Sequence, residues 1–321
     1  MQPYPVRHIG PGVHVFGPHL ELFWPGHFAA LHKRFAKLAD AIEDKACEAH
    51  ADAQRLIALI SMERADFDSL PEADKPAWRV NMQVVELTPA GTGLLVYSPV
   101  PLNAALKAGL DTLGPVRVVV APMSGHTAGL ASFRATYPDA LFVCPRGGGF
   151  LWQDLARQRP ELGFRPGLAD ASSIAGDERL WPLLGNQFEV EVTQDNLLFE
   201  ILLYHRPSRT VLSSDTVYKP DAQGAGPGPG GPQQVYLSPP WFASAYQLLN
   251  LDPSPNRCLP DNRFFLAQHP QFDRAGLAAS LRRVLAWDID CLLCCHTDPL
   301  HGPLARQVIH NTWGWLLESV G

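Results

Sequence analysis

The chain has 321 residues, of which 46% are hydrophobic and 18% are charged, and its formal net charge is −6. This composition is typical of a soluble globular protein that can bury a substantial core. A negative chain without clustered Lys and Arg argues against nucleic-acid binding and gives no reason to expect contact with an anionic membrane surface. Its apolar runs are far shorter than the ~20 residues that a membrane-spanning helix requires.

The N-terminal segment and the cysteines indicate the cellular compartment of the protein. The segment has no basic patch followed by an apolar run, so we expect no signal peptide. Four of the six cysteines are embedded in apolar patterns, which is typical of reduced, buried thiols. The sequence therefore predicts a cytoplasmic protein.

The first quarter of the chain combines a short strand with a helical region. Residues 10–16 (GPGVHVF) predict a strand opened by a Gly-Pro turn. Apolar residues then recur at helical spacing over 26–63, which predicts one long helix or a pair. An acidic, Pro-bearing linker follows at 69–76.

From residue 82 onward the pattern changes to strands that alternate with helices. The first part predicts strands at 82–88, 93–98, 117–121 and 140–144, with helices at 102–113 and 129–137. The second part predicts strands at 188–192, 197–204, 210–213 and 291–295, with helices at 273–287 and 304–317. This order indicates two sheets with helices outside them. Residues 219–263 are rich in Pro and Gly, and such a segment is either a linker or a long loop over a site.

Three polar residues each follow a predicted apolar strand. His126 follows 117–121, Asp215 follows 210–213 and His296 follows 291–295. Taken alone, each has a structural explanation, as a loop histidine or as a capping or turn residue. Together they form a set of two histidines and one carboxylate, which catalytic zinc sites and non-haem Fe(II) sites both use. We therefore predict a metal site at these strand ends.

The order of segments resembles the metallo-β-lactamase-fold superfamily and, within it, the DUF4336 family of uncharacterised proteins. The resemblance covers about residue 82 to the C-terminus and the short strand before Trp24, whereas 25–75 reads as a helical insertion that has no match. It implies one domain over 1–321 with a four-layer αββα metallo-β-lactamase-like sandwich. The segments that carry it are 95–100 (LVYSPV), 119–122 (VVAP), 137–140 (YPDA), 204–210 (YHRPSRT) and 295–299 (CHTDP).

The resemblance also implies a reduced set of metal ligands. Proteins of this superfamily bind two metals through an HxHxDH loop, a later His, a bridging Asp and a last His. His126 falls on the final His of the loop, Asp215 on the bridging Asp and His296 on the last His. The other loop ligands are replaced by Ala121, Met123 and Gly125, and residues 193–196 (TQDN) stand where the middle His is expected. The resemblance therefore implies one divalent metal at most, zinc rather than iron, or none.

These observations lead to a prediction of function with two alternatives. The favoured function is a mononuclear metal-dependent hydrolase of a small ester, lactone or amide, with a metal-activated water as the nucleophile. Glu200, together with His205 or His301, is a candidate fourth ligand or general base. The alternatives are a degenerate, non-catalytic binding protein and a non-haem iron oxidoreductase that uses the same ligands. The expected partner is a small molecule, and the apolar stripe of the helical insertion makes a homodimer one option.

Overall fold

The computed structural model describes the following residues: 6–22, 51, 54–55, 57–59, 61–71, 74–75, 77–89, 92–123, 125–146, 155–164, 176–193, 199–217, 237–238, 273–296 and 298–320. The chain divides into two compact units. The first comprises Met1–His19, Val80–Tyr218 and Gln271–Gly321, and the second comprises Leu20–Arg79 and Lys219–Pro270. The predicted insertion 25–75 and the predicted loop 219–263 both fall within the second unit.

The second unit contains few described elements. Helix α3 (Arg64–Ser69) lies within the predicted insertion, and most of the helical region predicted before it lies outside the described residues. Strand β10 (Leu237–Ser238) pairs antiparallel with Ala77 and Trp78, which begin strand β3 (Ala77–Leu87). The rest of the predicted loop 219–263 also lies outside the described residues.

The first unit begins with a hairpin where the sequence predicted a single strand over 10–16. Strand β1 (Val6–Gly10) pairs antiparallel with β2 (Val13–Leu22). The turn between them includes Gly12, whose φ of 66° lies in the left-handed region that glycine adopts at no steric cost. The predicted Gly-Pro turn lies at this place, whereas the strand before it, β1, was not predicted.

The first sheet has the order β1-β2-β3-β4-β5-β6, and β10 pairs with β3 beside this path. Strands β4, β5 and β6 run parallel, while β3 and β4 are antiparallel. Helix α4 connects β4 to β5, and its N-cap Asn103 accepts a hydrogen bond from Leu106 N–H. The bounds are β4 (Gly93–Tyr97), α4 (Ala104–Leu113), β5 (Val116–Val120), α5 (Leu130–Thr136) and β6 (Leu141–Val143).

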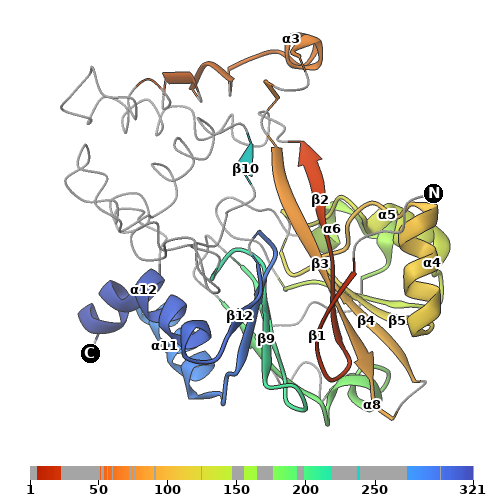
Figure 1. Ribbon diagram of the computed structural model, residues 1–321, viewed down its shortest axis with the longest axis vertical. Coiled ribbons are helices and arrows are strands. Elements are labelled where there is room, and N and C mark those ends of the chain that lie inside the picture. Colours follow the sequence, from red (N-terminus) through yellow and green to blue (C-terminus); the bar gives the residue numbers. More distant parts are fainter. Residues whose placement is uncertain are drawn as a thin grey trace. The chain divides into compact units, whose positions relative to one another are not determined.

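The second sheet has the order β12-β11-β9-β8-β7, and only β9 and β11 run parallel. Helices α11 and α12 lie beside each other along this sheet (Figure 1). Between β6 and β7 the described residues form the short helices α6 (Leu155–Gln158), η2 (Pro160–Leu162) and α8 (Trp181–Leu184). The remaining bounds are β7 (Phe188–Val192), β8 (Ile201–His205), β9 (Thr210–Ser213), α11 (Arg274–Ala286), β11 (Cys291–Cys294), β12 (Leu300–His301) and α12 (Pro303–Ser319).

The two sheets share one hydrophobic core. Buried residues from both sheets form a single cluster, which includes Val119 and Leu203. The Tyr97 hydroxyl of β4 donates to the Ile201 carbonyl of β8 at 2.7 Å and so links the sheets directly. The predicted mixed α/β class with two sheets and outer helices is therefore confirmed. Among the described residues, no helix combines the length and apolarity that a membrane crossing requires.

Gly129 provides a test of the packing between β4 and the loop that follows β5. Its N–H donates to the Pro99 carbonyl at 3.1 Å, and a Cβ at this position would lie 2.4 Å from the Val100 carbonyl oxygen. We expect Gly129→Ala to lower the free energy of unfolding by about 1–3 kcal/mol or more, because backbone atoms would have to move. Urea denaturation measures this change.

The matched control is Gly314→Ala in α12. The nearest atom to a Cβ there is Glu318 Oε1 at 4.0 Å, so the methyl group has space. Alanine is favoured over glycine within a helix by up to about 1 kcal/mol, and this variant should be as stable as the wild type or more so. Equal effects of the two substitutions would contradict the steric explanation.

Candidate metal centre

The register of two parallel strands brings Asp215 and His296 together. The last paired residues of β9 and β11 are Ser213 and Cys294. Asp215 and His296 each lie two residues beyond this pair, at the same edge of the second sheet. Parallel neighbouring strands place their carboxyl ends at one edge, where open α/β sheets bind ligands.

His126 reaches the same place from the first sheet. It lies in the loop after β5, where its N–H donates to the Met123 carbonyl at 3.2 Å. Ile201 N–H of β8 donates to the Pro122 carbonyl at 2.9 Å, and this bond fastens the loop to the second sheet. The three predicted strand-end residues therefore meet, although they come from two different sheets.

Asp215 lies between the two imidazoles. Its Oδ1 atom is 3.1 Å from His126 Nε2 and 3.1 Å from His296 Nε2. The ring centroids of the two histidines are 5.2 Å apart. The side chains of His126 and His296 are 5% and 8% exposed, whereas that of Asp215 is 14% exposed. One potential ligand atom from each residue lies within 4.8 Å of the other two.

The charges of the three groups depend on one another. Burial alone would lower the pKa of His126, but the Asp215 carboxylate raises that pKa well above its ordinary value. Burial alone would raise the pKa of Asp215, but the two histidines hold it well below its usual range. Asp215 is therefore a carboxylate, and a positive charge beside it is strongly favoured.

This arrangement fits a single metal ion. A carboxylate oxygen 3.1 Å from two imidazole nitrogens fits either two N–H donors or three ligands around one metal ion. Donor atoms around a tetrahedral zinc at ~2.0–2.1 Å lie about 3.3 Å apart, which is close to the observed 3.1 Å contacts. Ser98 Oγ lies 2.7 Å from Nδ1 of His126, so the other ring nitrogen remains available to a metal.

The positions that the sequence resemblance assigns to further metal ligands carry no imidazole. Ala121 and Met123 are fully buried and apolar. Thr193, which stands near the expected middle histidine, uses its backbone and hydroxyl to pair with Glu200. The described residues around the cluster therefore offer ligands for one metal position.

Glu200 supports the site from behind and is not placed to act as a base. It is fully buried, and its carboxylate accepts hydrogen bonds from the backbone N–H groups of Ser214, Asp215 and Thr216 at 2.7–2.9 Å. The Ser213 hydroxyl donates to it as well, at 2.9 Å. Both carboxylate oxygens are thus occupied by the loop that carries Asp215. These contacts do not support the predicted role of Glu200 as ligand or base, and they place it where it holds the Asp215 loop.

The predicted strand over 197–204 also begins later than expected, at Ile201. Glu200 lies just before β8, and its N–H donates to the Thr193 hydroxyl at 3.0 Å. The sequence pattern suggested a buried glutamate that needs a partner, but it did not show that the partner is backbone.

Two further residues hold the Asp215 loop. Trp313 of α12 donates its Nε1–H to the Thr216 carbonyl at 2.7 Å. The Cys294 thiol contacts the Val217 carbonyl. Neither residue was predicted as part of the site. The described cysteines, which are Cys144, Cys291, Cys294 and Cys295, are buried and form no disulfide, as the apolar patterns predicted.

His205 lies at the wrong end of β8 to take part in the site. It pairs with Thr210 at the start of β9, whereas His126, Asp215 and His296 lie beyond Ser213, at the other end of that strand. Three residues of strand separate these positions, which corresponds to about 10 Å. Its Nδ1 lies 2.7 Å from the Ser208 hydroxyl in the turn between the strands. The prediction of His205 as base or ligand is therefore not supported by its position.

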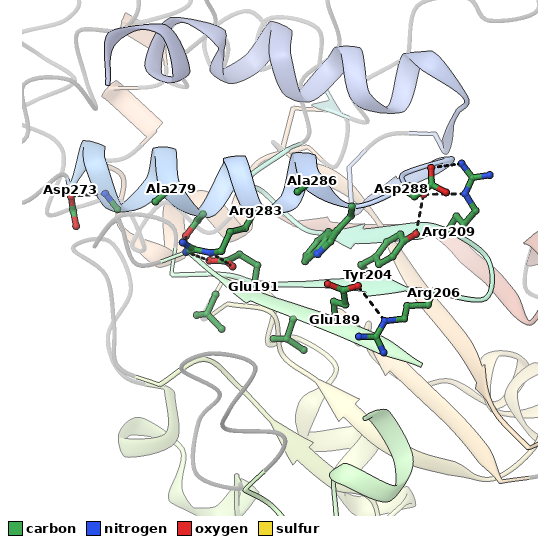
Figure 2. Close-up of a pocket in the computed structure, with 15 residues that line it drawn as sticks. Glu189, Glu191, Tyr204, Arg206, Arg209, Asp273, Ala279, Arg283, Ala286 and Asp288 are labelled. Carbon is green, nitrogen blue, oxygen red and sulfur yellow. Dashed lines mark hydrogen bonds and ion pairs between the residues drawn. The ribbon is translucent and has the colours of Figure 1, made fainter. Parts of the chain in front are cut away.

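A groove of about 1090 Å³ lies between strands β7 and β8 and helix α11 (Figure 2). Three arginines line it, and each is paired with a carboxylate: Arg206 with Glu189, Arg209 with Asp288 and Arg283 with Glu191. Tyr204 stacks on Trp287 in its wall. None of His126, Asp215 and His296 lines the groove, so it does not define a substrate pocket for them.

Solved structures of the metallo-β-lactamase fold align with most of the chain. One is the metallo-β-lactamase FIM-1 from Pseudomonas aeruginosa in the mono-zinc form, with 10% identity, a TM-score of 0.48 and coverage of 99% of this chain and 97% of that one. A metallo-β-lactamase from Hirschia baltica gives 11% identity, a TM-score of 0.44 and coverage of 98% of both chains. The metal-soaked Flv1 flavodiiron core from Synechocystis sp. PCC6803 gives 10% identity and a TM-score of 0.49; the alignment covers 98% of this chain and 61% of Flv1.

A scan of the sequence against known protein families gives no match, and a search of curated proteins gives none either. At these identities and TM-scores, the structural matches carry no argument about the chemistry of the site. The case for a metal centre rests on the three residues and their contacts.

The contribution of the Glu200 hydrogen bonds to stability can be tested in metal-free protein. Glu200→Gln keeps the shape of the side chain but turns an NH₂ group toward backbone donors. We expect the free energy of unfolding to fall by about 1–3 kcal/mol or more, because hydrogen bonds to a charged group are lost in a buried place. Urea denaturation in the presence of a chelator measures it.

Glu189→Gln is the matched control, because Glu189 lies on the neighbouring strand and pairs with Arg206 at the surface. An exposed ion pair contributes about 0–1 kcal/mol, so this change should be mild. Equal losses in the two variants would mean that Glu200 does not hold the loop.

His205 gives a prediction about acid stability. Burial lowers the pKa of His205 to about 4. As pH falls from about 6.5 to 4, the unfolded chain takes up a proton that the folded protein does not bind, so stability is lost over this window. The loss is on the order of 2–3 kcal/mol. We expect His205→Asn to flatten the dependence of the urea midpoint on pH over this range.

His310→Asn replaces an exposed histidine and serves as the control. Its dependence of stability on pH should match that of the wild type. A wild-type slope that persists in His205→Asn would show that another group controls acid unfolding.

Proposed function

We propose that His126, Asp215 and His296 bind one divalent metal ion, with zinc favoured over iron, and that the protein is a metal-dependent hydrolase of a small ester, lactone or amide. The observation that carries the proposal is the position of Asp215 Oδ1, 3.1 Å from the Nε2 atoms of both histidines. Two histidines and a carboxylate are a ligand set that catalytic zinc uses with one position left open.

The residues of the chain have separate tasks in this proposal. A divalent metal at this position supplies Lewis acidity and an activated water. Asp215 is more exposed than either histidine, so a substrate approaches from its side of the cluster. Glu200 holds the Asp215 loop, and both of its oxygens accept hydrogen bonds from that loop. It therefore orients the loop that carries a ligand.

The absence of imidazoles at Ala121 and Met123 favours one metal over two. A binding protein without catalysis and an iron-dependent oxidoreductase use the same three ligands, and the experiment below separates them. Membership of the DUF4336 family, a homodimer formed through 25–75 and a cytoplasmic location remain predictions from the sequence.

Metal analysis and titration test the proposal. We expect wild-type protein to bind about one equivalent of Zn²⁺. We expect His126→Ala and His296→Ala to weaken binding by more than about 100-fold, since losing a residue that only supports a ligand already costs about 10–100-fold. His301→Ala, which removes an exposed histidine on β12, should bind zinc like the wild type.

Hydrolysis is then assayed with the zinc-loaded protein on a panel of nitrophenyl esters, lactones and anilides. Turnover that disappears in His126→Ala supports the hydrolase. Zinc binding without turnover of any class would favour the non-catalytic alternative. Bound iron with consumption of oxygen would favour the oxidative one, and no stoichiometric metal in the wild type would overturn the proposal.

A further inference from the structure

Ser98 combines deep burial with a strained backbone. It directly follows β4 and is 1% exposed, and its φ of 57° lies in the left-handed region. Residues other than glycine rarely adopt this region, because Cβ approaches the carbonyl oxygen. Its N–H donates to the Val120 carbonyl of β5 at 3.0 Å, so the conformation is fixed by the sheet. Strain of this kind calls for an explanation in function.

The change in backbone direction lets two consecutive side chains support the candidate metal centre. Neighbouring residues of a strand point to opposite faces of the sheet. Tyr97 points into the core, where its hydroxyl bonds the Ile201 carbonyl and lies 3.4 Å from the Glu200 carboxylate. Because the chain leaves the extended conformation at Ser98, the Ser98 side chain reaches His126.

The contact between Ser98 and His126 determines which ring nitrogen is available. Ser98 Oγ lies 2.7 Å from His126 Nδ1. If Nδ1–H donates to the hydroxyl oxygen, Nε2 is the nitrogen that faces Asp215, where it donates its own N–H without a metal and would offer its lone pair to a bound metal. Metal-binding histidines almost always donate their other N–H to an oxygen in this way.

We propose that Ser98 is a positioning residue, which holds His126 with Nδ1 protonated and Nε2 directed at the metal position. The strained backbone is kept because it brings the hydroxyl to the imidazole. The role in metal binding rests on the proposed function above, whereas the orientation of His126 does not.

The test compares Ser98→Ala with Ser98→Gly. Both remove the hydroxyl, but only glycine relieves the left-handed conformation. We expect both variants to bind Zn²⁺ about 10–100-fold more weakly than the wild type in a competition titration with a chromophoric chelator. We also expect metal-free Ser98→Gly to melt at a higher temperature than Ser98→Ala, so that the loss of affinity does not follow stability.

Arg209→Gly is the matched control, because Arg209 also has a positive φ, 53°, and lies in the turn between β8 and β9 at the far end from the cluster. It relieves the same kind of strain and should leave zinc affinity unchanged. Long-range ¹⁵N NMR of the histidine rings gives a second readout. The Nδ1 proton of His126 should be protected from exchange in the wild type and exposed to exchange in both Ser98 variants.

The outcomes separate the two proposals. Wild-type zinc affinity in either Ser98 variant, with zinc bound by the wild type, would overturn the role of Ser98 and leave the metal site standing. A weaker affinity with an unchanged His126 ring signal would overturn it as well. If the wild type binds no zinc, the proposed function fails, and the ring signal of the metal-free protein alone decides whether Ser98 orients His126.

Discussion

The carboxylate of Glu200 is fully buried and accepts hydrogen bonds from three consecutive backbone N–H groups, those of Ser214, Asp215 and Thr216. A buried charge is costly unless it is fully hydrogen-bonded, and here the donors are the backbone of the functional loop itself. The same bonds that satisfy Glu200 therefore fix the conformation of that loop. With its backbone held from behind, Asp215 points its side chain toward the two histidines. The electrostatics of the cluster depend on this placement: burial alone would lower the pKa of His126, and the neighbouring Asp215 carboxylate raises it.

The cluster is also a junction between the two sheets. His126 comes from the first sheet, and Asp215 and His296 come from the second. Tyr97 and Ser98 at the end of β4 support both sides: Tyr97 contacts Glu200, and Ser98 contacts His126. A cation that binds three ligands from two sheets would stabilise their packing, since binding to the folded state alone lowers its free energy. Metal binding at this cluster would therefore be linked to the stability of the fold.

The sequence was sufficient to predict the parts of the site that depend on strands. The predicted strands ended within one residue of the ends of β5, β9 and β11, and His126, Asp215 and His296, which follow these strands, lie together in the structure. The sequence could not predict the role of Glu200, because its partners are backbone N–H groups that any residue provides. It misplaced His205 for a different reason: a polar residue at a strand end looks the same at either edge of a sheet. Ser98 lies at a strand end too, but its importance depends on a left-handed φ, for which serine gives no signal.

The candidate site has three ligands, and neighbouring residues hold two of them in place. A serine in the left-handed region costs about 1–2 kcal/mol that a glycine would avoid. A buried carboxylate is costly as well, because an apolar side chain in its place would need no hydrogen-bond donors. Both features stand next to the cluster, and each fixes one of its members: Ser98 contacts His126, and Glu200 contacts the Asp215 loop. Histidines that only filled space in the core would gain nothing from this support. The cost is explained if His126 and Asp215 must meet a third partner in one fixed geometry, which is what coordination of a metal requires.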